Sequence, residues 1–173
     1  IAQYEQGGRL LVWELSSCET WCMIGYHAIP VISEAYLRDI KGFDMNKAFE
    51  AMKFSAMEDR NGLKSYKDNG YIKYMGDGEN VSRTLEYAYD DWCIAMAAQK
   101  LGKTEDYNYF IKRAQNYKNL YDASTGFMRP KQDAFMTPFD PYRVDHNYTE
   151  ANAWQYSFYV PQDISGHIKL LGG

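Results

Sequence analysis

Apolar residues recur at helical spacing in the first third of the chain. Between residues 23 and 40 they lie about 3.6 positions apart, at Ile24, Ala28, Val31, Ile32, Ala35, Tyr36 and Ile40. Pro30 falls in the first turn of this predicted helix, where its missing N–H costs nothing. Asp44 is a good N-cap for a second helix, which carries Ala48, Met52 and Ala56 on one face.

A glycine-rich connection separates these helices from the clearest helix of the chain. Residues 59–80 contain Gly62, Gly70, Gly76 and Gly78, which predicts a long irregular segment of the kind that is often functional. Ser82 is the expected cap of a helix over 85–101, and Gly102 is expected at its C′ position. Because the helical pattern ends at Gly102, the helix is predicted to stop there.

A further helix is predicted directly after that stop. It begins at Thr104, has Glu105 and Asp106 in its first turn, and runs to about Leu120. Because the turn between the two helices is so short, they should form an antiparallel helical hairpin. Residues 121–147 then return to loop.

The last predicted elements are a short helix after Thr149, ending before Pro161, and a final helix from about Asp163. Strand alternation is not convincing anywhere, so the predicted class is all-α. Helical hairpins joined by long aromatic loops suit an α/α toroid, which needs more helices than this chain supplies. We therefore expect residues 1–173 to be a single piece of such a barrel, and the termini Ile-Ala-Gln-Tyr and Leu-Leu-Gly-Gly look cut.

Composition and charge narrow the classes of partner. The formal net charge is −4 and no basic tract interleaves with the aromatic residues, which argues against nucleic acid. No run of 18 apolar residues is present, so no membrane span is predicted, and these residues contain no signal peptide. The three cysteines, Cys18, Cys22 and Cys93, match no zinc motif and are expected to be buried free thiols.

Aromatic residues make up 16% of the chain, and sixteen of them are tyrosines. Such a surplus is typical of carbohydrate sites, where rings stack on sugar faces. It is also typical of a helical core with tyrosines at its edges, and composition alone favours this second interpretation.

Residues 147–163, NYTEANAWQYSFYVPQD, set one carboxylate, Glu150, among several rings. In one interpretation, Thr149 caps a helix and Glu150 complements its dipole; Asn152 at the third helical position rules out a capping box. In the other, Glu150 is a general acid, kept protonated by an apolar, aromatic wall as glycosidases require. Spacing alone leaves both interpretations open.

Other charged residues have simpler interpretations. Glu86 and Asp90 are four residues apart on one helix, where a solvated face is the usual outcome, although they sit beside a stripe of rings. His27 lies on an apolar stripe and is expected in the core. His146 and Glu150 have a spacing that zinc ligands can use, but no third ligand is near, so we predict no metal site within the chain.

Four blocks in order carry a resemblance to a known family. They are VWELSSCETWCMIGYHAIPVI, TLEYAYDDWCIAMAAQKLGK, YDASTGFMRPK and NYTEANAWQYSFYVPQDISGHIKLLGG, and they cover nearly the whole chain. The sequence resembles glycoside hydrolase family 92, whose members are calcium-dependent, inverting α-mannosidases. The resemblance implies an (α/α)6 catalytic barrel that follows an N-terminal β-sandwich domain.

The family pattern around the acidic block is Thr-Glu-Gly-Asn-Ala-Trp-Gln-Tyr, and its glutamate is the general acid. This role maps onto Glu150, with Ala151 in place of the usual glycine. A second departure is Cys18, where the family commonly has asparagine. Trp154, Gln155 and Tyr148 flank the acid and are expected to line the sugar pocket. Glu86 and Asp90 are weaker candidates, as supports of the site or of helix packing.

The resemblance also implies what lies elsewhere. The general base and the main calcium ligands belong to His-Gly-Asn-Glu-Pro and Gly-Asn-Asp-Asp motifs, which this sequence lacks. The expected partners are mannose-containing glycans and the remainder of the same enzyme, in the periplasm or outside the cell. α-1,2 linkages are the expected substrates, and the isolated piece should be inactive, with exposed apolar faces.

The competing class is a non-catalytic scaffold of helical hairpins. Such a protein would bind glycans or peptides through its tyrosine-rich loops and would need no carboxylate at position 150.

Overall fold

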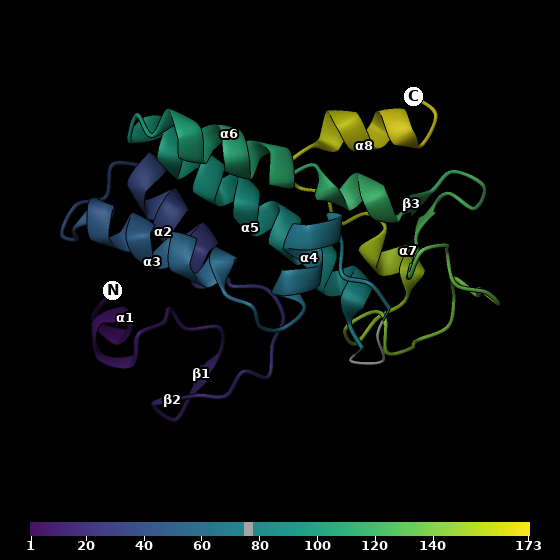
Figure 1. Ribbon diagram of the computed structural model, residues 1–173, viewed down its shortest axis with the longest axis horizontal. Helices are drawn as coiled ribbons and strands as arrows, with labels where there is room; N and C mark the ends of the chain where they lie inside the picture. The colour runs from purple at the N-terminus through teal and green to yellow at the C-terminus, as the bar shows by residue number, and fades with distance from the viewer. Residues whose placement is uncertain (75–77) are drawn as a thin grey trace. The chain divides into compact units, whose positions relative to one another are not determined.

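The computed structural model describes residues 1–74 and 78–173 and is predominantly helical, with two very short β-ribbons (Figure 1). The predicted all-α class is therefore confirmed. The chain divides into two compact units: Ile1–Glu58 with Asp90–Ala114, and Asp59–Tyr89 with Gln115–Gly173. Helix α5 (Asn80–Lys100) contributes its first half to the second unit and its second half to the first.

The first unit begins with helix α1 (Ala2–Gly7) and an antiparallel ribbon. Strands β1 (Glu14–Leu15) and β2 (Cys18–Glu19) pair Leu15 with Cys18. Cys18 and Cys22 are exposed, and only Cys93 is a buried free thiol. The prediction that all three are buried is wrong because the segment around Cys18 forms a surface ribbon.

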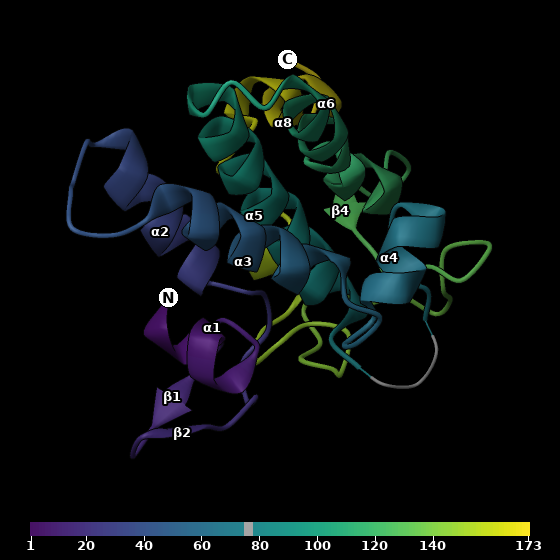
Figure 2. The same cartoon turned by 60° about the vertical axis from the view of Figure 1, so that its left-hand side comes forward.

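Helices α2 (Ala28–Leu37) and α3 (Met45–Met57) lie side by side (Figure 2). Pro30 is in the first turn of α2, and the Asp44 side chain caps α3 by accepting from the amides of Asn46 and Lys47, both as predicted. The predicted face of α3 is buried, because Ala48, Met52 and Ala56 are fully covered. Local sequence signals were sufficient for both helices.

The predicted hairpin is formed by α5 and α6 (Thr104–Arg113). Gly102 has φ +72° and its amide donates to the Gln99 carbonyl, which confirms its role as the helix stop. Two bounds were wrong. Helix α5 begins at Asn80, so Ser82 is inside it and is not its cap; α6 ends at Arg113, and a separate 3-10 helix, η1 (Asn116–Leu120), follows.

Side-chain bonds to backbone carbonyls hold the helices of the first unit together. The Ser33 hydroxyl on α2 donates to the Cys93 carbonyl on α5 at 2.8 Å. The Arg113 guanidinium on α6 donates to the Ala56 carbonyl on α3 at 3.2 Å and pairs with Asp91 on α5 at 2.8 Å. Each contact satisfies a buried polar group that would otherwise be costly.

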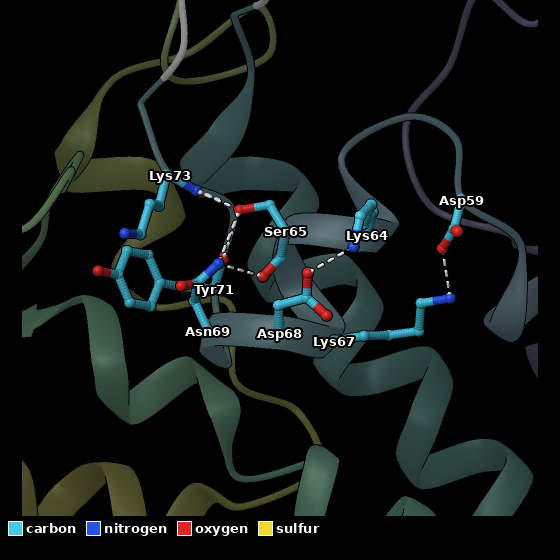
Figure 3. Close-up of polar contacts among 8 residues, drawn as sticks. All are labelled: Asp59, Lys64, Ser65, Lys67, Asp68, Asn69, Tyr71 and Lys73. Atoms are coloured by element: carbon cyan, nitrogen blue, oxygen red, sulfur yellow. Dashed lines mark hydrogen bonds and ion pairs between the residues drawn. The ribbon is translucent and has the colours of Figure 1, made fainter.

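The second unit includes helix α4 (Leu63–Asn69), within the segment predicted to be irregular. That prediction was wrong over these residues: Gly62 and Gly70, both with positive φ, flank a helix. Gly76 lies outside the described residues. The Ser65 hydroxyl of α4 donates to the Tyr71 carbonyl and accepts from the Lys73 amide, so α4 fixes the segment that follows it (Figure 3).

The rest of the second unit is a ribbon and two short helices. Strands β3 (Tyr121–Asp122) and β4 (Phe127–Met128) are antiparallel, and α7 (Ala153–Tyr156) contacts β4. Helix α8 (Ile164–Leu170) begins where a final helix was predicted, and the Asp163 side chain caps it by accepting from the Gly166 amide. The core of this unit consists of Tyr71, Val81, Leu85, Ala88, Tyr117, Leu120, Met128, Tyr148, Ala151, Ala153 and Val160.

The cap of α7 differs from the prediction. Its N-cap is Asn152, not Thr149, and Asn152 and Gln155 form a capping box. Thr149 and Glu150 therefore precede the helix and lie in a turn. No helix in the described residues has the length and apolarity needed to cross a membrane.

Candidate active site

Glu150 occupies a strained position at the surface of the second unit. It lies in the turn before α7, is exposed, and has φ +51°. A side chain other than glycine in this left-handed region costs on the order of 1 kcal/mol and persists where surrounding contacts enforce it. Such strain is common at functional positions.

The alanine that follows is accommodated without strain of this kind. The left-handed conformation falls on Glu150 and not on Ala151. Ala151 is only 6% exposed and its methyl group packs in the core of the second unit. The departure from the family glycine therefore adds an anchor directly beside the acid.

The N-terminus of α5 holds the segment that precedes Glu150. The amides of Val81 and Ser82 both donate to the Asn147 carbonyl, at 3.2 and 3.4 Å. The Ser82 hydroxyl accepts from the Thr149 amide at 2.6 Å. Ser82 is fully buried, so this contact is shielded from water.

Glu79 adds a second set of contacts to the same segment. Its carboxylate accepts from the Thr149 hydroxyl at 3.0 Å and pairs with Arg83 at 2.8 Å, and its amide donates to the His146 carbonyl. We call Glu79, Ser82 and Thr149 the clamp. It fixes the backbone on the N-terminal side of Glu150.

Close approach of two backbones requires a glycine next to the clamp. Gly78 has φ +74°, and a Cβ atom there would lie 3.0 Å from the His146 carbonyl oxygen. The glycine-rich pattern predicts that Gly78 lies in a functional segment, but it does not single out Glu79. The available signal was an acid at the end of a glycine-rich run, immediately before a strong helix.

Glu150 borders a pocket of about 580 Å³ in the second unit. The volume is within the usual range for small-molecule sites, roughly 300–1,000 Å³. Its lining includes acids, a guanidinium and an imidazole. The lining residues are Gly78, Glu79, Arg143, Val144, Asp145, His146, Tyr148, Thr149 and Glu150. A lining so rich in hydrogen-bonding groups suits a polyhydroxylated ligand.

Tyr148 is the one predicted pocket residue that lines this pocket with Glu150. It is only 3% exposed, and its hydroxyl donates to the Met128 carbonyl at 2.7 Å. Burial, together with the charge of Asp145, raises the pKa of this phenol. Tyr148 is thus a neutral, fixed part of the core beneath the pocket.

Trp154 and Gln155 are exposed but are not among the residues that line this pocket. The Trp154 ring meets Phe127 edge to face at 4.8 Å, and the Gln155 side chain accepts from the Asn152 amide in the capping box. The predicted aromatic wall does not bury Glu150 in this chain. The Trp154 ring instead packs against Phe127 and Tyr142.

Glu86 and Asp90 are both buried, so the solvated-face interpretation of this pair is wrong. Burial raises the pKa of the Tyr156 phenol, and the nearby Glu86 charge adds to this, while hydrogen bonds to Ser82 and Thr149 oppose it. Glu86 is therefore near Tyr156, whose phenol bonds to Ser82 and Thr149 of the clamp, and a supporting role for Glu86 stays a prediction.

Asp90 has a packing role in the first unit. It accepts from the Tyr26 amide at 2.9 Å, and His27 Nδ1 lies 3.5 Å from its other oxygen. Burial raises the pKa of Asp90, against the influence of His27 and the amide. The expected core position of His27 is replaced by a half-buried one beside this carboxylate.

Residues 1–74 and 78–173 contain no group of three or more histidine, cysteine, aspartate or glutamate side chains arranged to hold a metal ion.

Comparisons with known proteins show which proteins this chain resembles in sequence and fold. The chain is 45% identical to a family GH92 α-mannosidase of Bacteroides thetaiotaomicron, with a TM-score of 0.91 over 95% of this chain and 23% of that one. It is 32% identical to a family GH92 inverting mannosidase from strain VPI-5482 of that species, with a TM-score of 0.94 over 99% and 25% of the chains. These matches agree with the expected fold, a segment of an (α/α)6 toroid.

A curated relative is an uncharacterized secreted glycosidase of Arthroderma benhamiae, 31% identical over 98% of this chain and 27% of that protein. The chain thus spans about a quarter of the length of the relatives it matches. The family model for the glycosyl hydrolase family 92 catalytic domain matches residues 1–173. The chain belongs to glycosyl hydrolase family 92.

Proposed function

We propose that the complete enzyme containing this chain hydrolyses α-mannosidic bonds, with inversion and with α-1,2 linkages as its substrates. The observation that carries this proposal is Glu150: an acid on a strained, clamped turn at the edge of a polar pocket, in a glycosidase family. A solved structure similar to this chain is a family GH92 α-mannosidase in complex with mannoimidazole. Mannose-containing glycans are the corresponding ligands proposed here.

Glu150 is the proposed general acid. Its carboxylic proton passes to the glycosidic oxygen as the bond from that oxygen to the anomeric carbon breaks, and the leaving sugar departs as an alcohol. Water attacks the opposite face of the anomeric carbon and loses its proton to a second carboxylate. In inverting enzymes the two carboxyl groups are about 6.5–9.5 Å apart.

The second carboxylate is proposed to come from the remainder of the enzyme. Glu79 shares the pocket, but Arg83 and the Thr149 hydroxyl occupy its oxygens, which suits a positioning role. The rest of the enzyme would also cover Glu150, since desolvation favours the protonated carboxyl that a general acid needs. The isolated 173-residue chain is accordingly expected to be inactive.

Calcium dependence is proposed from the family resemblance, with the main ligands outside these residues. A secreted relative supports a location in the periplasm or outside the cell. The described part of the chain provides the acid and its support, and the remainder of the enzyme is its structural partner.

The stereochemistry of the product tests the proposal. The complete enzyme should release β-mannose first from α-1,2-mannobiose, observed by proton NMR before mutarotation. Release of α-mannose first would contradict inversion. Absence of any hydrolysis of mannosides by the complete enzyme would favour the scaffold class.

A further inference from the structure

A second pocket of about 340 Å³ adjoins the Glu150 pocket within the second unit. The two pockets share Arg143, Asp145 and His146 in their linings. A ligand that extends beyond the first pocket along these residues therefore enters the second. Tyr74, Phe139 and Asn147 are among the other residues that line the second pocket.

An unsatisfied acceptor marks this second pocket. Asn147 Oδ1 is buried and has no hydrogen-bond partner among the residues that the structure describes. Its Nδ2 donates to Asp145 Oδ1 at 2.9 Å, and because a carboxylate only accepts, this bond fixes which side of the amide is oxygen. A buried acceptor of this kind is costly unless a donor reaches it. A ligand hydroxyl is a suitable donor.

Tyr74 supplies an aromatic surface at the same pocket. Tyr74 is 37% exposed, and its amide donates to the Lys131 carbonyl at 2.9 Å. The segment before it is fixed by the Ser65 contacts to Tyr71 and Lys73, and the Tyr71 hydroxyl donates to the Gln132 carbonyl (Figure 3). The position of Tyr74 is therefore determined by both α4 and the 131–132 segment.

A row of rings continues from this pocket. Phe139 contacts Phe127 at 5.8 Å, Phe127 contacts Trp154, and Trp154 contacts Tyr142 at 6.1 Å between ring centroids. Trp154 is 43% exposed and Tyr142 is 71% exposed. Exposed rings beside hydrogen-bonding groups match the alternating apolar and hydroxyl-bearing surfaces of a sugar, and they do not match an ion or a purely apolar ligand.

We infer that this second pocket is an accessory saccharide subsite, which binds a further neutral sugar residue of the glycan that reacts at Glu150. Tyr74 contacts the sugar ring and Asn147 Oδ1 accepts from one of its hydroxyls. This inference rests on the proposed function for the choice of glycan. It extends that function by making the enzyme prefer chains longer than a disaccharide.

Binding to a non-hydrolysing enzyme tests the subsite without requiring turnover. In the complete enzyme carrying Glu150→Gln, calorimetry should show α-1,2-linked mannotriose binding about tenfold more tightly than α-1,2-mannobiose. Adding Tyr74→Ala should remove most of that difference and leave the affinity for the mannobiose unchanged. Phe158→Ala, which removes an exposed ring outside this pocket, is the matched control and should preserve the difference.

Equal affinity for the two ligands would overturn the subsite, as would an equal weakening of both by Tyr74→Ala. Asn147→Ala gives an independent check: it should weaken the trisaccharide selectively, and circular dichroism establishes that it folds. Failure of the proposed mannosidase function can be distinguished from failure of the subsite. In that case the wild-type enzyme would cleave no mannoside, whatever the calorimetry shows.

Discussion

At the scale of single residues, the account depends on how the clamp places Glu150. The Thr149 amide meets the buried Ser82 hydroxyl at 2.6 Å, and the Thr149 hydroxyl meets Glu79 at 3.0 Å. Both contacts act one residue before the strained turn. A positional error of about 1 Å in a reacting group is sufficient to reduce catalysis by about a hundredfold.

Ser82→Ala removes one contact of the clamp without altering the acid. In the complete enzyme we expect kcat/KM for α-1,2-mannobiose to fall by about ten- to a hundredfold. An aryl mannoside with a good leaving group needs little protonation, so its hydrolysis should fall much less. Steady-state kinetics with both substrates measures the difference.

Ser55→Ala is the matched control for this prediction, because Ser55 is also a buried helical serine, bonded to the Ala51 carbonyl. It should leave the ratio of the two rates unchanged. An equal loss on both substrates with Ser82→Ala would indicate a general structural role and would contradict positioning of the acid.

Residue-scale patterns predicted Glu150 but not what holds it. A sequence resemblance identifies an acid within a motif. Glu79 and Ser82 are 68 or more positions away from Glu150 in the sequence, and they contact Thr149 only through the tertiary fold. Ser82 was interpreted as a cap because serine commonly has that local role. Here its hydroxyl serves another segment of the chain.

At the scale of elements, helix bounds with local causes were predictable. Asp44 and Asp163 cap their helices and Gly102 ends α5, because each signal acts within a few residues. The start of α7 was not predicted. Thr149 is bonded to the clamp, and the helix begins only after its N-cap, Asn152. Tertiary contacts override local preference at such positions.

The buried ion pair between Asp91 on α5 and Arg113 on α6 should contribute to the stability of the first unit. Asp91→Asn removes the carboxylate that pairs with the buried Arg113, although Tyr26 still donates to the side-chain oxygen. We expect a loss of about 3–5 kcal/mol in the free energy of unfolding, measured by urea denaturation of the complete enzyme. Asp68→Asn, in the exposed pair with Lys64, should cost under about 1 kcal/mol. If the two substitutions lowered the free energy of unfolding by similar amounts, burial would not make the Asp91–Arg113 pair more stabilising than the exposed pair.

The ribbon of the second unit should weaken in acid. Burial acts to raise the pKa of Asp122, but hydrogen bonds from Ser124 and the ion pair with Arg129 outweigh it and lower that pKa. A carboxyl group with a lowered folded-state pKa stabilises the fold above its ordinary pKa, and this contribution is lost as pH falls through the folded value.

Unfolding of the complete enzyme should therefore show a pH dependence that depends on Asp122. Between about pH 5 and about pH 3, the wild type should lose more free energy of unfolding than Asp122→Asn, which has no carboxylate to protonate. Urea titrations at several pH values provide the measurement. Parallel pH curves for the two proteins would rule out this contribution.

At the scale of the whole molecule, the chain is about a quarter of the length of its relatives, so the proposed catalysis is assigned to the complete enzyme. The sequence resemblance predicted the family and the helical class from four ordered motifs. It did not predict the second carboxylate or the metal ligands, because no motif for them occurs in this sequence.

Metal removal tests the proposed calcium dependence at this scale. The complete enzyme should lose more than about tenfold in kcat with EDTA and recover when calcium is restored, as expected for a metal that supports the reacting geometry. Magnesium is the control, since its smaller, octahedral preference makes it a poor substitute. Full activity after thorough chelation would contradict the calcium proposal.

The most direct test of the central claim compares Glu150→Gln with the wild type, in the complete enzyme, on two mannosides that differ in leaving group. If Glu150 is the general acid, kcat/KM for α-1,2-mannobiose should fall by about 10²–10⁴, because the leaving oxygen receives no proton. The rate with an activated aryl mannoside should be largely retained. A comparable loss on both substrates, or little loss on either, would contradict the assignment of Glu150 as the proton donor.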